Sequence, residues 1–394
     1  MRRNVLIVVM LVVLGINLRP IMATIGPLTD YLLHQWQLSY GWISLLNGVP
    51  IIMMGLGALT SYRLLRLADL RRLISFALLI LGISTLCRLI DHSPATMIAS
   101  AVMAGLGIAL AQAFLPIVIK RQWPGHTASF MGIYVSAIMA GAAISAAGAP
   151  ILLEHAGAAL ALGSWGWLAA PALLMFLRLV PVIPPQGAVA DTSSLTPGRF
   201  WRLAVFFGLG TSGFTCMLAW LPPHFLDLGY PPTQAGLALA LLSATEVVSG
   251  LVLSQLAARS ADRRPWVILA LLLAIAGMLC LNAGPNAAWL GVVLAGVGVG
   301  ALFPLSLIIC MDHLEDAQAA GIVTARVQGV GYLIAGILPM LAGVMRDTMH
   351  HFGLVWIGLA AVFAVAIWLA VGFDPKHYAR YRVHWQGMKN ECQG

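Results

Sequence analysis

The stretch INLRPIMATIGPLTD at residues 16–30 decides the fold class and the expected site. It continues an apolar run that begins at Val5 and is long enough to cross a bilayer, which takes about 20 residues. Arg19 therefore lies near mid-membrane, where an arginine costs roughly 2.5–3.5 kcal/mol on insertion scales. Pro20 lacks an N–H and frees the carbonyl of Ile16, so we expect the helix to break there. Because freed backbone groups at this depth need protein or water around them, the stretch predicts a polar cavity beside Arg19.

The composition places the whole chain in a membrane. Of its 394 residues, 60% are hydrophobic and only 9% are charged, against roughly 25% charged residues in soluble domains. The sequence therefore predicts an all-α polytopic membrane protein. Arg2 and Arg3 resemble the start of a signal peptide, but Arg19 and Pro20 interrupt the cleavage region, so we expect the first run to remain as a helix. Twelve membrane spans are expected, at residues 4–30, 39–62, 71–90, 95–119, 128–152, 159–180, 200–223, 233–258, 266–283, 286–311, 318–345 and 352–372.

The formal net charge of +8 reports the topology of the chain and not a nucleic-acid partner. If the N-terminus is cytoplasmic, eighteen of the 22 Lys and Arg residues lie on the cytoplasmic side of the predicted spans. Arg88 and Arg346 fall outside, and Arg19 and Arg326 lie within the membrane. The positive-inside rule requires such a bias, so both termini are expected in the cytoplasm. The lipid bilayer is then an expected partner and nucleic acid is not.

The two halves of the chain carry the same features in the same order. Asp69 in ADLRR corresponds to Asp262 in ADRR, 193 residues later, and glycine and proline positions recur at offsets between 189 and 195. Such ordered offsets indicate an internal duplication. Six spans per half put both halves in the membrane in the same orientation, as in a parallel repeat. We expect two pseudo-symmetric six-helix bundles, at residues 1–180 and, with a cytoplasmic tail, 199–394, joined by a Pro-rich cytoplasmic linker at 181–198.

Three charged residues lie well inside predicted spans, and intramembrane charges are functional candidates by default. They are Arg19, Glu246 and Arg326, and their roles stay open at this point. Glu246 and Arg326 would form an ion pair, or Arg19 and Arg326 would hold an anionic group from opposite bundles. Glu246 is also a candidate for proton coupling, because burial raises the pKa of a carboxyl group. The structural alternative for Arg19 is a helix cap or a side chain that reaches the interface.

Neutral polar residues in the spans are candidates for the orienting contacts that a small-ligand site needs. Thr211 has an alternative role in hydrogen bonding to its own helix, which is common for a membrane Thr, and Tyr134 has one in packing. The candidates for substrate binding are Asn17, Arg19, Gln112, Tyr134, Thr211, Arg326 and Gln328.

Two predicted cytoplasmic loops, at 66–72 and 259–264, each set an Asp between basic residues. Such loops can pair charges across the interface of the bundles and close the inward side. The alternative is a positive-inside loop with an incidental Asp. The candidate gate residues are Asp69, Arg72, Asp262 and Arg263.

The sequence offers no pattern for catalysis or for a cofactor. It contains no nucleotide-binding P-loop pattern, no Ser-His constellation and no His or Cys spacing typical of a metal site, and none of its five cysteines forms a C-x-x-C pair. We therefore expect no catalytic residues, no metal and no cofactor. An enzyme and an ATP-driven pump are both disfavoured.

Short segments along the whole chain carry a resemblance to a known family. They are LRP at 18–20, GPL at 26–28, GLG at 105–107 with Gln112 and Pro116, AWLP at 219–222, DRR at 262–264, FPL at 303–305, and QG at 328–329 with Pro339. With them the chain resembles the major facilitator superfamily and, within it, the cyanate transporter branch, which includes a 2-nitroimidazole exporter. The branch holds Arg19 and Gln328 in similar form. Glu246 and Arg326 depart from it, and these added charges suit a larger anion or a zwitterion, or neutralise each other.

The resemblance implies a secondary active transporter that works by alternating access. Its substrate would be a small compound, either a cyanate-like anion or a heteroaromatic molecule, moved across the inner membrane of a bacterium with protons as a candidate coupling ion. We expect a monomer. One rival interpretation is a multidrug-type efflux pump for hydrophobic or cationic compounds, with Glu246 as the cation partner. The other is a membrane receptor that transports nothing.

Overall fold

The computed structural model describes residues 2–90, 93–123, 126–183, 193–315 and 317–384 of the chain. The elements of the first half are helices α1 (Arg2–Asn17), α2 (Pro20–Ala23), η1 (Gly26–Leu28), α3 (Thr29–His34), α4 (Tyr40–Leu67), α5 (Leu70–Cys87), α6 (Pro94–Gln122), α7 (Thr127–Gly163), η3 (Ser164–Leu168) and α8 (Ala169–Leu179). The elements of the second half are strand β1 (Ser193–Leu195), helices α9 (Pro197–Asp227), α10 (Pro232–Ala258), α11 (Arg264–Asn282), α12 (Pro285–Asp312), α13 (Ala317–Met349), α14 (Gly353–Val371) and η4 (Pro375–Tyr381), and strand β2 (Arg382–His384).

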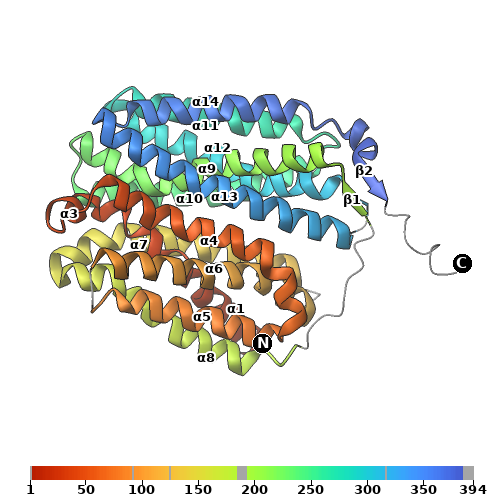
Figure 1. Ribbon diagram of the computed structural model, residues 1–394, viewed down its shortest axis with the longest axis horizontal. Helices are drawn as coiled ribbons and strands as arrows, with labels where there is room; N and C mark the ends of the chain where they lie inside the picture. The colour runs from red at the N-terminus through yellow and green to blue at the C-terminus, as the bar shows by residue number, and fades with distance from the viewer. Residues whose placement is uncertain (1, 91–92, 124–125, 184–192, 316, 385–394) are drawn as a thin grey trace, which may run out of the picture.

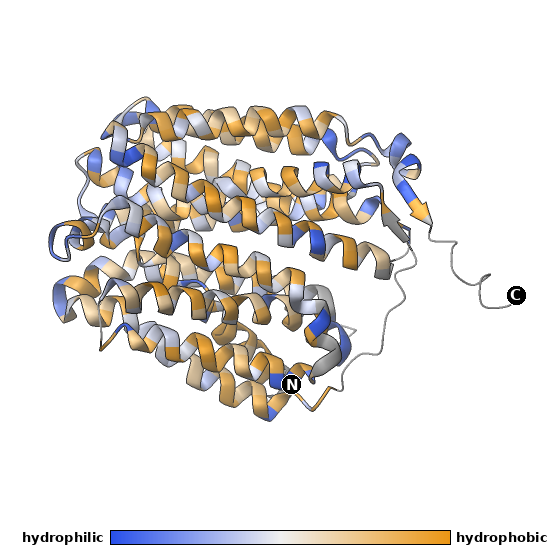
Figure 2. Cartoon of the chain, in the orientation of Figure 1, coloured by the Kyte–Doolittle hydropathy of each residue, from blue (hydrophilic) through white to orange (hydrophobic). Residues whose placement is uncertain are grey.

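The long helices form two groups that lie side by side with their axes roughly parallel (Figure 1). Helices α1 to α8 form one group and α9 to α14 the other, and α4 packs along α13 where the groups meet. Large apolar side chains such as Phe76, Leu174 and Trp368 are exposed on the outside. Hydrophobic residues cover the helices along most of their length, while many hydrophilic residues gather near their ends (Figure 2). This is the surface of a protein whose flanks face lipid.

Eleven segments of the described residues are long and apolar enough to span a membrane. One of them, Ser129–Leu179, has 51 residues, which as one helix would measure about 77 Å, against roughly 30 Å of hydrocarbon. It bends at Gly157, whose φ of +84° favours a glycine, and it holds both α7 and α8. The twelve-helix, all-α fold class is therefore confirmed. The expected gap at 153–158 is replaced by helix that continues to Gly163 beyond the kink.

The first span is broken where the sequence predicted it. Helix α1 ends at Asn17, and α2 begins at Pro20 with Arg19 as its N-cap residue. A backbone carbonyl just after the break is satisfied by the C-cap residue of α5, because Nη1 of Arg88 donates to the carbonyl of Ile21 at 2.8 Å. Arg88 was expected as a charge of the outer loop, but its side chain is fully buried. It supports the broken helix from within the first group.

At the end of the molecule away from the linker, α4 and α13 approach each other closely. A Cβ atom on Gly48 would lie 2.6 Å from the carbonyl oxygen of Gly336, and one on Gly55 would lie 2.7 Å from that of Gly329. Only residues without a side chain permit such an approach, and in lipid this packing replaces the hydrophobic drive for association. The α4–α13 contact thus joins the two groups of helices from the end opposite the linker to the middle of the membrane.

An aromatic cluster completes this closed end. Tyr40, the first residue of α4, lies 5.9 Å from Trp220 of α9 and 6.2 Å from Phe352 of the second group, measured between ring centroids. The guanidinium of Arg346 lies 4.8 Å from the centroid of the Tyr40 ring. Oδ2 of Asp227 accepts a hydrogen bond from Arg346 at 2.8 Å and holds it there. Arg346, expected in an outer loop, therefore belongs to the contact between the two groups.

A two-stranded ladder at the linker end was not anticipated from the sequence. Strand β1 pairs antiparallel with β2, with Ser193 opposite His384 and Leu195 opposite Arg382. It joins the start of the second group to the tail of the chain. The expected bundle boundaries at 180 and 199 stay predictions, and residues 184–192 of the expected linker lie outside the described residues.

The same end holds a buried histidine. Nε of Arg199 donates to Nε2 of His313 at 2.8 Å, and Nδ1 of His313 donates to the carbonyl of Ile309. The ring stacks on Tyr378 of η4 at 3.8 Å. Burial, followed by the charges of Arg199 and Arg382, lowers the pKa of His313 to about 4. His313 is therefore a neutral hydrogen-bonding link between α12, α9 and the tail.

Candidate substrate-binding cavity

A cavity of about 990 Å³ lies between the two groups of helices. Its walls come from α4, α6 and α7 of the first group and from α9, α10, α12 and α13 of the second. Near its mouth the lining side chains of Arg63 and Arg326 are exposed, whereas Arg19 and Glu246 at its deep end are buried. The mouth lies at the end that carries the linker and the tail, because Arg63 is near the C-terminal end of α4 and Arg326 near the N-terminal end of α13.

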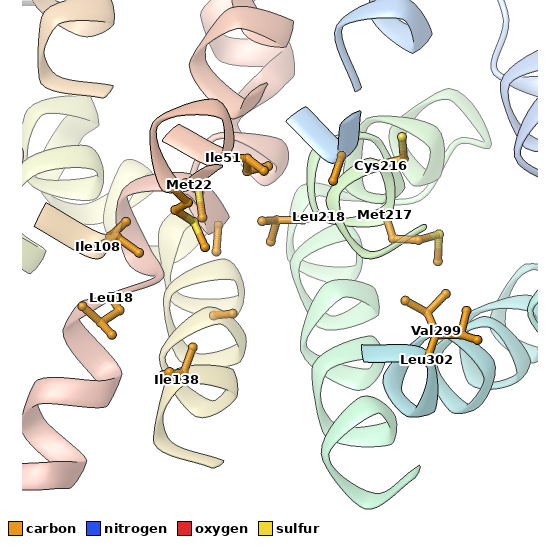
Figure 3. Close-up of a cluster of buried hydrophobic side chains, with 14 of the residues drawn as sticks. Leu18, Met22, Ile51, Ile108, Ile138, Cys216, Met217, Leu218, Val299 and Leu302 are labelled. Atoms are coloured by element: carbon orange, nitrogen blue, oxygen red, sulfur yellow. The ribbon is translucent and has the colours of Figure 1, made fainter. Parts of the chain in front are cut away.

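The cavity ends in apolar packing between the groups. Figure 3 shows Met22 and Ile51 of the first group close to Leu218 of the second. All three side chains are at most 1% exposed. Close packing of this kind leaves no room for water, so the cavity is closed on the side away from the linker.

Arg19 enters the cavity from the break between α1 and α2. It is 7% exposed, and its guanidinium carbon lies 4.9 Å from the centroid of the Phe214 ring on α9. Its Nε has no hydrogen-bond partner, and no ion pair to Arg19 is found among the described residues. The structural alternative, a cap on a neighbouring helix, is therefore not formed. A guanidinium over an aromatic ring, with a donor still free, is suited to binding an anion.

Glu246 reaches the cavity from the middle of α10. It is 5% exposed, and both of its carboxylate oxygens lack a hydrogen-bond partner. The expected alternative of a Glu246–Arg326 ion pair is therefore not formed here. The charged group that acts on Glu246 electrostatically is Arg19 from the opposite group of helices. The two residues face the same cavity without a hydrogen bond between them.

Hydroxyl groups from both groups of helices add to the polar lining. Tyr134 on α7 and Thr211 on α9 are 2% and 6% exposed, and neither hydroxyl has a hydrogen-bond partner. Thr211 thus does not bond to its own helix. Because buried polar groups are normally hydrogen-bonded, these free atoms indicate that a ligand or water completes the site.

The structure brings six of the seven predicted binding residues to this one cavity. Asn17 is the exception, since it is buried but does not line the cavity. The lining residues among the predicted set are Arg19, Gln112, Tyr134, Thr211, Arg326 and Gln328. Their roles in binding stay predictions.

Four aromatic lining residues were not among the predicted site residues, and two of them, Phe214 and Tyr332, lie one helical turn from predicted positions. Phe214 follows Thr211 by three positions, and Tyr332 follows Gln328 by four. Residues at these spacings share a face of a helix, so extending the predicted polar positions by one turn would have found both. An aromatic residue in an apolar span otherwise carries no distinguishing signal.

The expected gate residues all form pairs within their own group of helices. Asp69 caps α5 by accepting from the backbone N of Arg72 at 2.9 Å, and its other oxygen pairs with Nε of Arg72. Asp262 pairs with Arg264 at 2.7 Å, and hydrogen bonds from Arg264 lower the pKa of Asp262. Arg263 pairs with Asp312 at 3.2 Å. Among the residues that the structure describes, these four form no hydrogen bond or ion pair between the two groups, and their role as a cytoplasmic gate stays a prediction.

Comparisons of the sequence and of the fold with known proteins find similarity to transporters. The family model described as Major Facilitator Superfamily matches residues 5–339 and 226–386. The chain is 30% identical over 381 residues to the cyanate transport protein of Escherichia coli (strain K12), covering 93% of this chain and 97% of that protein. It is 26% identical over 373 residues to the 2-nitroimidazole transporter of the same organism, covering 91% and 93%. Among solved structures, a D-xylose–proton symporter matches with a TM-score of 0.70 at 17% identity, covering 94% of this chain and 97% of that one.

Proposed function

Because the chain belongs to the major facilitator superfamily, we propose that this multi-pass membrane protein is a secondary active transporter for a small anion or a small heteroaromatic compound. Membership makes it a transporter and not an enzyme. The names of two relatives, a cyanate transport protein and a 2-nitroimidazole transporter, indicate the same two substrate classes. We expect it to act as a monomer in the inner membrane of a bacterium.

The observation that carries this proposal is the buried guanidinium of Arg19 at the deep end of the cavity. Its Nε is free to donate, and its face lies over Phe214. An anionic group would bind to the free donor, and a flat ring would pack beside Phe214. The hydroxyls of Tyr134 and Thr211 would orient the bound compound.

Alternating access would use the two groups of helices as the moving parts. The closed contact between α4 and α13 and the cavity at the linker end describe one of the two required states. With the topology expected from the positive charges, this is the inward-facing state. Closure of the cytoplasmic side would then bring the loops of Asp69 and Asp262 together.

Transport into proteoliposomes tests the proposal. The panel consists of small inorganic anions, small carboxylates and 2-nitroimidazole, each measured with and without a pH gradient. We expect saturable uptake of one of these classes that Arg19→Ala reduces at least tenfold, while Arg121→Ala, at an exposed arginine outside the cavity, leaves it unchanged. If Glu246 couples transport to protons, Glu246→Gln should abolish accumulation driven by the gradient but retain exchange.

Two results would overturn it. Uptake of cationic compounds that survives Arg19→Ala and requires Glu246 would indicate a multidrug-type efflux pump instead. Tight binding without flux in sealed vesicles would indicate a receptor.

A further inference from the structure

Arg19 and Glu246 are two buried ionisable side chains that line one cavity from opposite groups of helices. Arg19 comes from the first group of helices and Glu246 from the second, and each is at least 93% buried. Both Glu246 oxygens and Nε of Arg19 lack partners. Because buried polar atoms are normally hydrogen-bonded, these unpartnered atoms on both sides of the cavity indicate that a bound ligand completes the site.

Packing of the backbone fixes Glu246 in place. A Cβ atom on Gly300 of α12 would lie 2.4 Å from the Cα of Glu246, so α10 and α12 are in direct contact at this level. One residue earlier on α10, the Cβ of Thr245 would lie 3.0 Å from a Cβ atom added to Gly296 of α12. Helix α10 therefore cannot shift toward α12 to carry the carboxylate away from the cavity.

Arg19 is fixed just as firmly. The turn that follows it is held by Arg88 through the Ile21 carbonyl. A Cβ atom on Gly26 would lie 3.1 Å from the carbonyl oxygen of Leu218 on α9. The chain that follows Arg19 is thus held at Ile21 and again at Gly26.

We propose that the substrate is bipolar, with an anionic group bound to Arg19 and an ammonium or N–H donor bound to Glu246. The inference rests on the proposed function and narrows its substrate class to small zwitterions and heteroaromatic anions that carry an N–H donor. Such a compound provides a partner for both buried side chains at once, with the hydroxyls of Tyr134 and Thr211 as additional partners. Its middle packs against the Phe214 ring. A compound with only one of the two groups leaves either Arg19 or Glu246 without a partner.

Three probes of nearly equal size and shape separate the contributions of the anionic group and the cationic group to binding. Piperidine-4-carboxylate is a zwitterion, cyclohexanecarboxylate has only the anionic group, and piperidine has only the cationic one. Equilibrium binding of each to the purified full-length protein is measured by calorimetry at one fixed pH without any ion gradient, so that gradient-driven accumulation plays no part. We expect the zwitterion to bind at least about tenfold more tightly than either of the other two, as a charge-assisted hydrogen bond provides.

Variants test whether Arg19 and Glu246 cause these differences in binding affinity. Glu246→Gln should weaken binding of piperidine-4-carboxylate about tenfold and leave cyclohexanecarboxylate unchanged, whereas Arg19→Gln should weaken both. Glu246→Asp, which keeps the charge, should recover part of the preference and guards against a folding defect. Glu154→Gln, at an exposed position outside the cavity, is the matched control.

The inference and the proposed function fail in different ways. If cyclohexanecarboxylate binds as tightly as the zwitterion, or if Glu246→Gln alters neither affinity, the bipolar substrate is excluded while binding that depends on Arg19 still supports an anion site. If the zwitterion does not bind to the wild-type protein, the bipolar substrate is likewise excluded. If Arg19→Gln leaves every affinity unchanged, the proposed function is lost as well.

Discussion

The guanidinium of Arg346 lies 4.8 Å from the centre of the Tyr40 ring, and these two residues come from opposite groups of helices. Asp227 fixes Arg346 through a hydrogen bond of 2.8 Å, and Trp220 and Phe352 surround the same ring. The contact closes the molecule at the end where α4 begins. In the proposed alternating-access cycle, the strength of this contact would help to set how often the opposite state is reached.

Removing the Tyr40 ring should loosen the closed end. Tyr40→Ala deletes a cation–π contact and two aromatic contacts, each worth about 0.5–1.5 kcal/mol. We expect labelling of a Ser44→Cys reporter, one turn into α4, by a membrane-impermeant maleimide to become about tenfold faster. Tyr40→Phe keeps the ring and should label at the parent rate. Equal rates for the Ala and Phe variants would show that the ring does not hold this end closed.

The close approach of α4 and α13 predicts that a side chain added at a glycine of this contact strongly reduces transport. Gly55→Ala puts a Cβ atom 2.7 Å from the carbonyl oxygen of Gly329, so the two helices must separate. We expect transport to fall more than tenfold while the protein still inserts and folds. Gly358→Ala, on α14, has no atom within 4 Å of its new Cβ and is the control. Full activity of Gly55→Ala would mean that the contact is dispensable to the cycle.

Arg88 should be essential for stability and not for recognition. Arg88→Met keeps much of the side-chain volume but loses the hydrogen bonds to the Ile21 carbonyl and to Ser100, both at 2.8 Å. Bonds from a charged donor contribute about 1.5–3 kcal/mol each, so we expect a clear decrease in the thermal unfolding temperature in detergent. Arg121→Met, at an exposed site, should unfold like the parent. An unchanged unfolding temperature for Arg88→Met would contradict this role.

Stability should depend on pH through His313. Its pKa is about 4 in the folded protein and about 6.5 when unfolded, so between these values the unfolded chain binds a proton that the folded chain does not. Stability contributed by the neutral ring is complete above about pH 6.5 and is lost as the pH falls toward 4, by roughly 3 kcal/mol in total. Unfolding temperatures measured between pH 7.5 and 4.5 test this. His313→Gln should flatten the profile, and an equally steep profile in that variant would assign the effect to another group.

The sequence identified the residues whose chemistry is unusual for their surroundings. Arg19, Pro20 and Glu246 stand out because charges and helix breaks are costly in an apolar span. Phe214 and Tyr332 were missed because an aromatic ring in such a span looks the same whether it packs against lipid, protein or ligand.

Contacts between residues that lie far apart in the sequence were also not predicted. Arg88 and Arg346 were interpreted as charges of the outer loops from their position alone, although one supports a broken helix and the other joins the two groups. The pairing of β1 with β2 joins residues nearly two hundred positions apart, and local propensity carries no information on such a pair. Which side of the cavity is open could not be predicted either, because both states of a transporter share one sequence and differ little in free energy.

The pairing of β1 with β2 attaches residues 382–384, near the end of the chain, to the start of the second group of helices. In the proposed alternating-access cycle, residues 382–384 would move with the start of α9. A fluorophore on the tail and a second on the outer end of α8 would therefore report each cycle of the protein as a change in energy transfer. The strand pair that sequence analysis did not foresee thus offers a direct way to watch transport one molecule at a time.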